Sequence, residues 1–532
     1  MNKDVATRDI QEGKTVLGLE LGSTRIKAVL IGEGHAPIAG GEFGWENRLE
    51  NGIWTYSLED VWKGIQAAYA ALAADVKEKY GLDLSKIAGF GVSAMMHGYL
   101  PFDKDGKQLA DFRTWRNTTT EAAATELTQL LDFAIPQRWS IAHLYQAMLN
   151  GEGHVEDVAF LTTLAGYVHW QLTGERVMGV GEASGMFPID SETGDFDQRM
   201  IDLVDAKVKE KGYSWRLRDI LPQVLGAGED AGQITLEGAK LIDPSGVLLA
   251  NIPVAPPEGD AGTGMTATNA VAARTGNVSA GTSVFAMVVL EKPLSKVYPE
   301  IDMVTTPTGK PVAMVHCNNC TSDINAWAGM LKGFAEAAGL QLSMNDVFST
   351  LFISAMKGAK DCNGIINIPY LSGEPVTGLS QGRPMLVRGA ESGLAFSDFA
   401  RSLLSGAMAS LKIGMEILAR EQVKMEVLFG HGGYFKTPLA GQKILSAALD
   451  TPISVMETAG EGGPWGMALL AAYRVRRSEG ESLGTYLKER VFATAQGSTI
   501  SPETADVEGF TGYTQQFQKA LKAQEKAVEW MK

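Results

Sequence analysis

Residues 15–32 read TVLGLELGSTRIKAVLIG, and this stretch decides the fold. Apolar and β-branched residues flank the turn Gly22-Ser23-Thr24, a pattern that predicts strand, tight turn and strand. Such a turn offers backbone N–H groups and hydroxyls to a polyanion, and its glycine lets a phosphate come close. Lys27 in the returning strand adds positive charge. We therefore expect a phosphate-binding hairpin, although Gly, Ser and Thr are also common in ordinary turns.

The same pattern recurs about half a chain later. Residues 278–290 read VSAGTSVFAMVVL and match residues 19–31, LELGSTRIKAVLI, in order: strand, turn, apolar strand. The second turn is Gly281-Thr282-Ser283. Each copy begins a long stretch in which strands alternate with helices, which predicts two similar α/β halves. Chance likeness of a short hairpin is the alternative, and a pair of turns holding one triphosphate is the more informative interpretation.

Hydrophobic periodicity places the other elements and a boundary. The segment 251–264, NIPVAPPEGDAGTG, has prolines followed by glycines and predicts two domains, 15–257 and 258–532. The remaining expectations are an amphipathic helix over 58–79, a buried strand over 87–94, a helix over 157–173 that ends at Gly174, a helix over 464–476 that begins at Pro464, and a charged helical tail over 512–532.

Composition limits the class of protein. The chain has 532 residues, 45% hydrophobic and 20% charged, which is ordinary for a soluble protein of two domains. The formal net charge is −15 and no basic run interrupts it, so nucleic acid is not expected as a partner. The N-terminal residues 1–14 are polar, and no apolar run suggests a membrane span. We expect a cytoplasmic protein with no membrane partner.

The three cysteines fit a reducing compartment. Cys317 and Cys320 form one C-x-x-C pair, and Cys362 stands apart. Such spacing can mark zinc or redox chemistry, but there is no second pair and the nearby ligand candidate is only His316. Metal or redox function is therefore disfavoured here.

Two carboxylates are candidates for chemistry. Asp260 lies among glycines in EGDAGTG, residues 258–264, and has few local side chains to pair with. It could take a proton from an attacking hydroxyl and help to hold Mg²⁺, which is most of what phosphoryl transfer requires. Glu20 interrupts an apolar strand and could hold Mg²⁺ through water. The plain alternatives are an Asp in a turn and a Glu on the solvent face of an edge strand.

Two further segments carry candidate binding residues. Gly430-His431-Gly432-Gly433 follows the apolar strand 427–429 and suits a nucleotide ring or ribose, without the GxGxxG spacing of a dinucleotide site. Glu461-Gly462-Gly463-Pro464 opens another helix. His97 lies in Met95-Met96-His97-Gly98 at a strand end, where it contacts a substrate hydroxyl or serves as a structural histidine.

Together these segments resemble the FGGY carbohydrate kinases, the family of xylulokinase, ribulokinase, gluconokinase and glycerol kinase. The resemblance covers about residues 15–473, and the order and spacing of its short matches are specific. The matching stretches are 18–24 and 281–283 (the phosphate loops), 91–98 (the substrate-side strand and turn, in its xylulokinase-like form), 172–175, 182–185, 259–261 (the catalytic aspartate) and 430–433 (the adenosine loop).

The resemblance implies an α/β fold of two actin-like, ribonuclease H-like domains of the sugar-kinase/actin superfamily, with a central cleft. Asp260 would be the general base, and Glu20 with Asp260 would hold Mg²⁺. ATP would bind mainly to the second domain and the sugar to the first, and closure would exclude water. The substrate residues would be Met96, His97, Trp115, Asn117, Gly259 and Asp260. The ATP residues would be Gly22, Ser23, Thr24, Lys27, Gly281, Thr282, Ser283, Asn325, Gly430, Gly432 and Gly433.

The acceptor implied is a ketose such as xylulose or ribulose, or a related polyol, with an aldonate also open. A homodimer is an assembly that the resemblance suggests. A non-catalytic sugar or nucleotide sensor on the same fold is the alternative. An actin-like ATPase is a third reading, which the Met-His-Gly and Gly-Asp-Ala segments disfavour.

This sequence departs from the family pattern at three places. Glu20 stands where an Asp is usual, and His431 interrupts what is usually a run of glycines. The segment 114–119, TWRNTT, aligns with Trp-x-Asp-x-Arg, so that Asn117 replaces the Asp and Thr119 the Arg. Because that Asp commonly contacts the sugar, these changes favour a different acceptor over lost activity.

Overall fold

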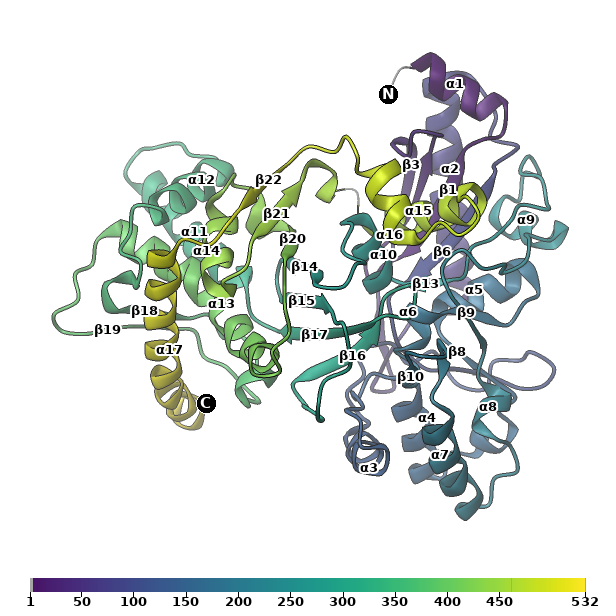
Figure 1. Ribbon diagram of the computed structural model, residues 1–532, viewed down its shortest axis with the longest axis horizontal. Coiled ribbons are helices and arrows are strands. Elements are labelled where there is room, and N and C mark those ends of the chain that lie inside the picture. Colours follow the sequence, from purple (N-terminus) through teal and green to yellow (C-terminus); the bar gives the residue numbers. More distant parts are fainter. Residues whose placement is uncertain (1–2, 461, 532) are drawn as a thin grey trace. The chain divides into compact units, whose positions relative to one another are not determined.

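The computed structural model describes residues 3–460 and 462–531. The chain forms two compact units, each with its own sheet and helices (Figure 1). The first unit comprises Met1–Val271, Met303–Val312 and Glu461–Thr494. The second comprises Ala272–Asp302, Ala313–Gly460 and Ala495–Lys532.

The first unit is built on a five-stranded sheet with the order β13-β6-β1-β2-β3. β1 is antiparallel to β2 and parallel to β6, and β13 is parallel to β6. Apolar residues make β1 and β6 almost entirely buried, as expected for strands covered on both faces. The strands are β1 Val16–Leu21, β2 Arg25–Ile31, β3 Pro37–Gly44, β6 Gly89–Ala94 and β13 Glu258–Gly259.

Helices α2 (Leu58–Tyr80) and α15 (Gly462–Arg476) cover opposite faces of this sheet. A Cβ at Gly18 of β1 would collide with the backbone of α15, and a Cβ at Gly41 of β3 would collide with the backbone of α2. Gly41 pairs with Ala28 of β2, which pairs with Leu19 of β1, so Gly41 and Leu19 point to the same face. Gly18 is the residue next to Leu19 in β1, and it therefore points to the opposite face. Glycine therefore lets a helix approach each face at backbone distance.

A seven-stranded sheet with the order β16-β17-β15-β14-β20-β21-β22 belongs mainly to the second unit. Most of β16 and the first two residues of β17 fall in Met303–Val312, which is counted with the first unit. β14 is antiparallel to β15 and parallel to β20, which repeats the pairing of β1 with β2 and β6. The internal repeat seen in the sequence is thus a repeat of topology. The strands are β14 Thr275–Ala280, β15 Val284–Val289, β16 Ile301–Thr305, β17 Pro311–Cys317, β20 Val427–His431, β21 Ile453–Met456 and β22 Gly497–Ile500.

Most predicted elements are present, and one is wrong in part. The helix expected over 157–173 is only α5, Leu164–Thr173. The preceding residues form β8 (Phe160–Thr162), which pairs with β7 (Leu100–Phe102) and buries all three of its residues. A distant strand partner therefore overrides the local helical pattern. The helix expected to begin at Pro464 begins two residues earlier, at Gly462.

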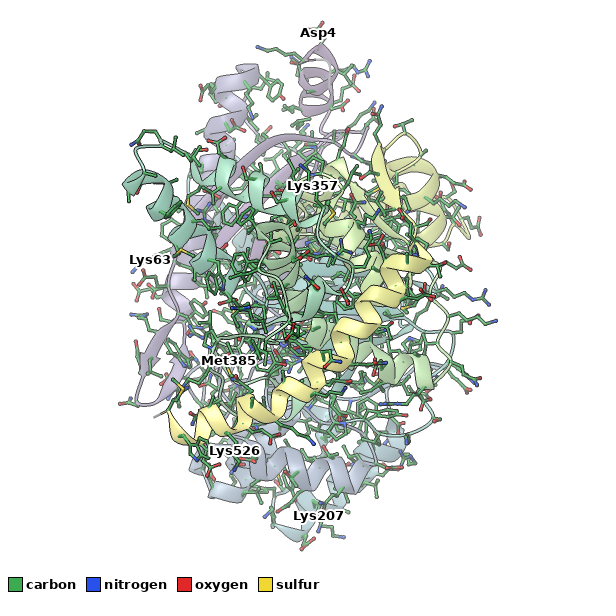
Figure 2. All side chains as sticks on the ribbon, turned by 90° about the vertical axis from the view of Figure 1, so that its left-hand side faces the viewer. Asp4, Lys63, Lys207, Lys357, Met385 and Lys526 are labelled. Atoms are coloured by element: carbon green, nitrogen blue, oxygen red, sulfur yellow. The ribbon has the colours of Figure 1, made fainter. Side chains whose placement is uncertain are left out.

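Two long helices organise the second unit. Helix α13, Phe396–Arg420, is long and apolar enough to span a bilayer by length and composition, but 78% of its apolar window is buried inside the protein. The predicted helical tail is α17, Thr504–Trp530, which crosses this unit in Figure 2 with Lys526 near its C-terminal end. Its residue Phe517 packs in one apolar cluster with Met385 of β19 (Met385–Arg388).

Candidate active site

A row of polar side chains crosses the first sheet near the carboxyl ends of its parallel strands. Glu20 of β1 lies opposite Lys27 of β2 and Ser93 of β6, and Ser93 lies opposite Glu258 of β13. Residues directly paired in a sheet point to the same face, so one face carries two carboxyls. In open α/β sheets ligands bind at this carboxyl edge.

Asp260 follows this row as the first residue of helix α10, Asp260–Ala267. Its side chain is exposed, and its Oδ1 accepts a hydrogen bond of 3.2 Å from the backbone N–H of Met96. Surrounding protein raises the pKa of Asp260, and backbone N–H groups, that of Met96 first, oppose the rise. The carboxyl is thus fixed in direction yet open to a ligand.

The carboxyls of Glu20 and Asp260 interact electrostatically. Burial, and then the charge of Asp260, raise the pKa of Glu20 to about 7, while Lys27 opposes the rise. Two like charges this close disfavour full ionisation, and a bound cation relieves that repulsion. In residues 3–460 and 462–531 no group of three or more His, Cys, Asp or Glu side chains is arranged to hold a metal directly. A pair of carboxylates is what Mg²⁺ uses when it keeps most of its waters, so this pair fits the ion.

His97 follows Met96, whose N–H bonds Asp260, and contacts of its own hold its ring in place. Its φ of 72° is left-handed, and its Nδ1 lies 3.3 Å from the carbonyl oxygen of Gly185. The ring stacks on Trp139, with centroids 6.5 Å apart. Burial first, and then the charge of Arg138, hold the pKa of His97 well below its usual value. The neutral ring donates through Nδ1 and leaves Nε2 as an acceptor.

The remaining residues predicted to bind substrate, Met96, Trp115 and Asn117, differ in exposure and in hydrogen bonding. Met96 is buried beside Gly259, and a Cβ on that glycine would lie 3.0 Å from the Met96 side chain. Trp115 is 40% exposed, whereas Asn117 is buried. The amide of Asn117 accepts from the Trp54 N–H and donates to the Trp54 carbonyl, both at 2.8 Å. An Asp there could not donate, so the Asn at this position has a clear backbone role.

The first predicted phosphate turn is held by aromatic side chains. The N–H of Gly22 donates to the Arg25 carbonyl at 2.9 Å, which closes the turn. Trp45 donates to the Gly22 carbonyl at 2.7 Å, and Trp115 donates to the Ser23 hydroxyl at 3.2 Å. Thr24 is exposed at the tip.

The second turn is held by the start of a helix. The N–H of Gly281 donates to the Ser283 carbonyl at 2.9 Å, and Thr282 is exposed. Thr321, the first residue of α11 (Thr321–Ala337), donates its N–H to the Gly281 carbonyl. Asn325 is exposed one turn further along α11.

The predicted adenosine loop lies beside this second turn. Gly430 and His431 still belong to β20, and they pair with Val278 and Ser279 of β14. Gly432 has φ 100°, and a Cβ there would lie 2.5 Å from a backbone oxygen, whereas a Cβ at Gly433 would meet nothing within 4 Å. The structure thus brings together the two glycine segments predicted for ATP in this unit. Of the segment 461–464, Glu461 lies outside the described residues.

Sequence reasoning missed two carboxyls of the site. Glu258 is buried, and desolvation raises its pKa to about 8. Glu182 is also fully buried, and burial raises its pKa well above the usual value. Both residues lie in segments that the sequence analysis singled out, 258–264 and 182–185. A charged residue flanked by small and apolar neighbours was the pattern that could have identified them as buried. The three cysteines, by contrast, are all buried and unbridged.

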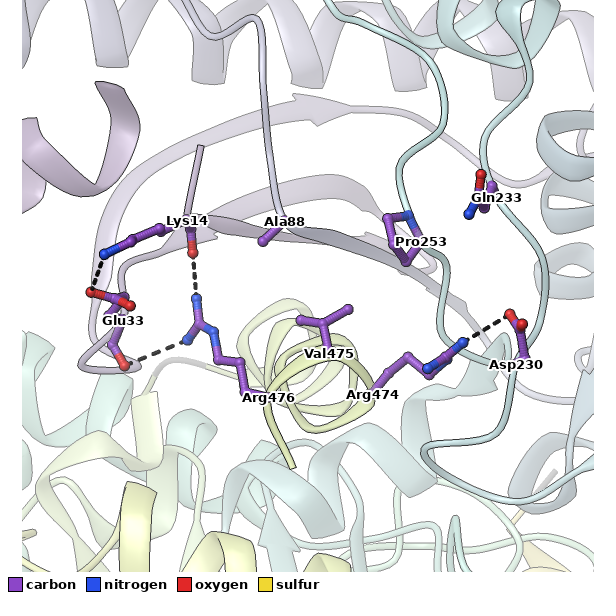
Figure 3. Close-up of a pocket in the computed structure, with 9 residues that line it drawn as sticks. All are labelled: Lys14, Glu33, Ala88, Asp230, Gln233, Pro253, Arg474, Val475 and Arg476. Atoms are coloured by element: carbon purple, nitrogen blue, oxygen red, sulfur yellow. Dashed lines mark hydrogen bonds and ion pairs between the residues drawn. The ribbon is translucent and has the colours of Figure 1, made fainter. Parts of the chain in front are cut away.

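A pocket of about 480 Å³ lies at the opposite ends of the same strands (Figure 3). Lys14 and Ala88, at its rim, precede β1 and β6. Arg476 donates to the Lys14 carbonyl at 2.6 Å, and Arg474 pairs with Asp230 at 2.9 Å. The charged side chains that line this pocket pair with one another and with backbone carbonyls. These contacts attach the end of α15 to the sheet.

Comparison with solved structures defines the class first. The chain matches a xylulose kinase from Rhodospirillum rubrum with a TM-score of 0.77 and 18% identity, over 96% of this chain and 98% of that one. It matches a gluconate kinase from Lactobacillus acidophilus with a TM-score of 0.76 and 16% identity, over 96% and 98%. The fold is that of two-domain sugar kinases, as the sequence predicts.

Family models then make the assignment. The N-terminal domain model of the FGGY family of carbohydrate kinases matches residues 15–266, and its C-terminal domain model matches residues 276–475. The chain belongs to the FGGY family of carbohydrate kinases. A xylulose kinase of Haemophilus influenzae is 20% identical over 506 residues, covering 93% of this chain and 97% of that protein. The protein is a carbohydrate kinase, distant from these relatives in sequence.

Proposed function

We propose that this kinase transfers the γ-phosphoryl group of ATP to a hydroxyl of a ketose or related polyol, with Asp260 as general base. The observation that carries the proposal is the placement of Asp260. Its carboxyl is exposed at the carboxyl edge of the first sheet, and the Met96 N–H aims it. A base must be within reach of the acceptor hydroxyl before its pKa matters.

The acceptor side is proposed to lie in the first domain, 15–257, together with Gly259 and Asp260. Nε2 of His97 accepts from a sugar hydroxyl because Nδ1 is committed to Gly185. Trp115 offers an exposed ring, and Asn117 donates to the carbonyl of Thr114, the residue before Trp115, at 3.0 Å. The xylulose, gluconate and glycerol kinases among the relatives and solved structures span ketose, aldonate and polyol acceptors, so these classes remain the substrates to test.

The nucleotide side is proposed to involve both turns and the second domain, 258–532. Gly22, Ser23 and Thr24 with Lys27, and Gly281, Thr282 and Ser283 with Asn325, offer N–H, hydroxyl, amide and ammonium donors to phosphate. Gly430, Gly432 and Gly433 leave room for the adenosine. When bound through Glu20 and Asp260, Mg²⁺ supplies charge neutralisation at the phosphates. We propose that the protein works in the cytoplasm, and a homodimer is the assembly to test.

The test is ADP release from Mg-ATP with a panel of acceptors: xylulose, ribulose, gluconate, glycerol and common hexoses. We expect one class to accelerate ADP release well above the rate with ATP alone. A flat panel with nucleotide binding confirmed separately would favour the alternative, a non-catalytic sensor on the same fold.

A further inference from the structure

A closed ring of hydrogen bonds joins the proposed base to the proposed substrate histidine. Asp260 accepts from the Met96 N–H at 3.2 Å, and the next residue, His97, bonds the Gly185 carbonyl. Gly185 lies just beyond the short helix α6, Val180–Ala183. The N–H groups at the start of α6 return to the carboxyl of Glu258, two residues before Asp260. Cutting the ring at Glu258 would therefore loosen both catalytic segments.

Glu258 bridges to α6 through both of its carboxyl oxygens. Oε1 accepts from the N–H of Gly181 at 3.2 Å, and Oε2 accepts from the N–H of Glu182 at 3.0 Å. The first N–H groups of a helix have no partner within it, so this carboxyl supplies what they lack. The other side of α6 is held by Thr305, whose hydroxyl donates to the Val180 carbonyl at 3.0 Å.

The carboxyl of Glu258 occupies a cradle made by glycines. A Cβ at Gly179 would lie 2.5 Å from its Oε1, a Cβ at Gly262 would lie 3.0 Å from its Oε2, and a Cβ at Gly181 would collide with the same oxygen. Three glycines from two chain segments thus omit a side chain around one buried carboxyl. Burying an acid is costly, and the N–H bonds from Gly181 and Glu182 offset part of that cost.

We propose that Glu258 is a positioning residue, which holds Asp260 and His97 in register by clamping α6 to the catalytic segment. This inference rests on the proposed function of Asp260. The carboxyl of the neighbouring Glu182 packs directly against Gly259, where a Cβ would collide with it, and so adds to the contact between α6 and the catalytic segment. The clamp fixes the main chain that carries Asp260 and His97, and a displacement of about 1 Å at a catalytic group can cost about 10²-fold in rate.

The experiment compares Glu258→Gln with wild type at saturating ATP. The Gln side chain keeps the shape but turns an NH₂ toward one of the two N–H donors, so one of them loses its partner. We expect kcat to fall on the order of 10²-fold and KM for the acceptor to rise, while KM for ATP stays within about twofold.

Asp243→Asn is the matched control. Asp243 is a buried carboxyl of the same unit that also accepts backbone N–H groups, among them those of Val247 and Leu248, but it lies outside the ring. It should lower thermal stability and leave kcat and the KM for the acceptor unchanged. If Glu258→Gln does not fold, Gly181→Ala displaces the same carboxyl from the other side and should give the same pattern.

Asp260→Asn separates this inference from the function on which it rests. An inactive Asp260→Asn enzyme beside a Glu258→Gln enzyme with wild-type kcat and acceptor KM would overturn the clamp and leave the proposed base intact. An active Asp260→Asn enzyme would overturn the base itself. If Glu258→Gln changes only thermal stability, as the control does, then Glu258 contributes to folding alone and does not position Asp260 and His97.

Discussion

The two hairpins that open the two units share a topology but differ in charge. In β1–β2 and in β14–β15 the first strand is antiparallel to the second and parallel to a third, and a Gly-led turn joins them. Two residues before the turn glycine, the first hairpin has Glu20 and the second has Ser279. One half therefore brings a carboxylate to its turn, and the other brings a hydroxyl.

The two turns also differ in what holds them. Indole side chains of Trp45 and Trp115 donate to the first turn, whereas the first N–H of α11 donates to the second through the Gly281 carbonyl. A Cβ at Gly22 would lie 3.1 Å from a backbone oxygen, but a Cβ at Gly281 would meet nothing within 4 Å. The two hairpins thus share one backbone pattern, and the carboxyl next to a turn is found in the first unit, at Glu20.

The largest effect should follow the loss of Asp260. Asp260→Asn keeps the shape and the acceptor for the Met96 N–H but removes the base, so we expect kcat to fall by about 10²–10⁴-fold. Nucleotide affinity, measured by calorimetric titration, should stay within a few-fold because the change affects a step rather than ATP binding. Retention of most of the turnover would remove Asp260 from the mechanism.

The charge difference between the hairpins gives the next test. Glu20→Gln should lower kcat by about 10–100-fold at fixed Mg²⁺ and raise the Mg²⁺ concentration needed, whereas Ser279→Ala should stay within about twofold. Since the pKa of Glu20 is raised to about 7, wild-type activity should fall as pH drops through neutrality and protonates it. Titration of Mg²⁺ at pH 6, 7 and 8 checks this, and equal responses of the two variants would abolish the distinction.

A third test separates packing glycines from ligand-facing glycines in the second unit. Gly433→Val should raise KM for ATP about tenfold or more with little change in thermal stability, because a Cβ there is free of protein. Gly432→Val is the contrast, since φ 100° and the Ala280 carbonyl make any side chain costly. We expect Gly432→Val to lower the thermal unfolding midpoint. An unchanged KM for Gly433→Val would move the adenosine elsewhere.

How much of this could be predicted from sequence depends on the distance over which each feature is set. The strand–turn–strand pattern is local, so both hairpins and the repeat of topology could be predicted. The row that joins Glu20, Ser93 and Glu258 depends on the register of three strands far apart in the chain, which no local pattern states. Burial of Glu258 follows from that register, and burial of Glu182 follows from the packing of α6 against β13, so sequence reasoning overlooked both.

Two other positions show how tertiary partners decide the outcome. Phe160–Thr162 is apolar and continuous with a helical pattern, yet it pairs with Leu100–Phe102 as a strand. Asn117 looked like a substituted sugar ligand, but its amide bonds both backbone groups of Trp54. In each case the decisive partner lies some 60 residues away, where neither periodicity nor motif can indicate it.

The smallest expected effect concerns stability, and it compares a buried acid from each unit. Glu258 accepts two successive N–H groups in the first unit, and Glu374 accepts those of Asn318 and Asn319, both at 3.3 Å, in the second. Burial raises their pKa values from 4.5 to about 8 and about 7. Between pH 4.5 and these values the folded protein holds protons that the unfolded chain has released, so stability must fall as pH rises.

Thermal unfolding at pH 5, 6, 7 and 8 measures this dependence. The midpoint should decline by roughly a few degrees across the range in wild type. Glu374→Gln removes one titrating group and should make the decline from pH 5 to 7 shallower, while the step from 7 to 8, to which Glu258 and Glu182 contribute, should persist. A midpoint that rises with pH in wild type would mean that both carboxyls are ionised in the folded protein, and that their N–H bonds outweigh their burial.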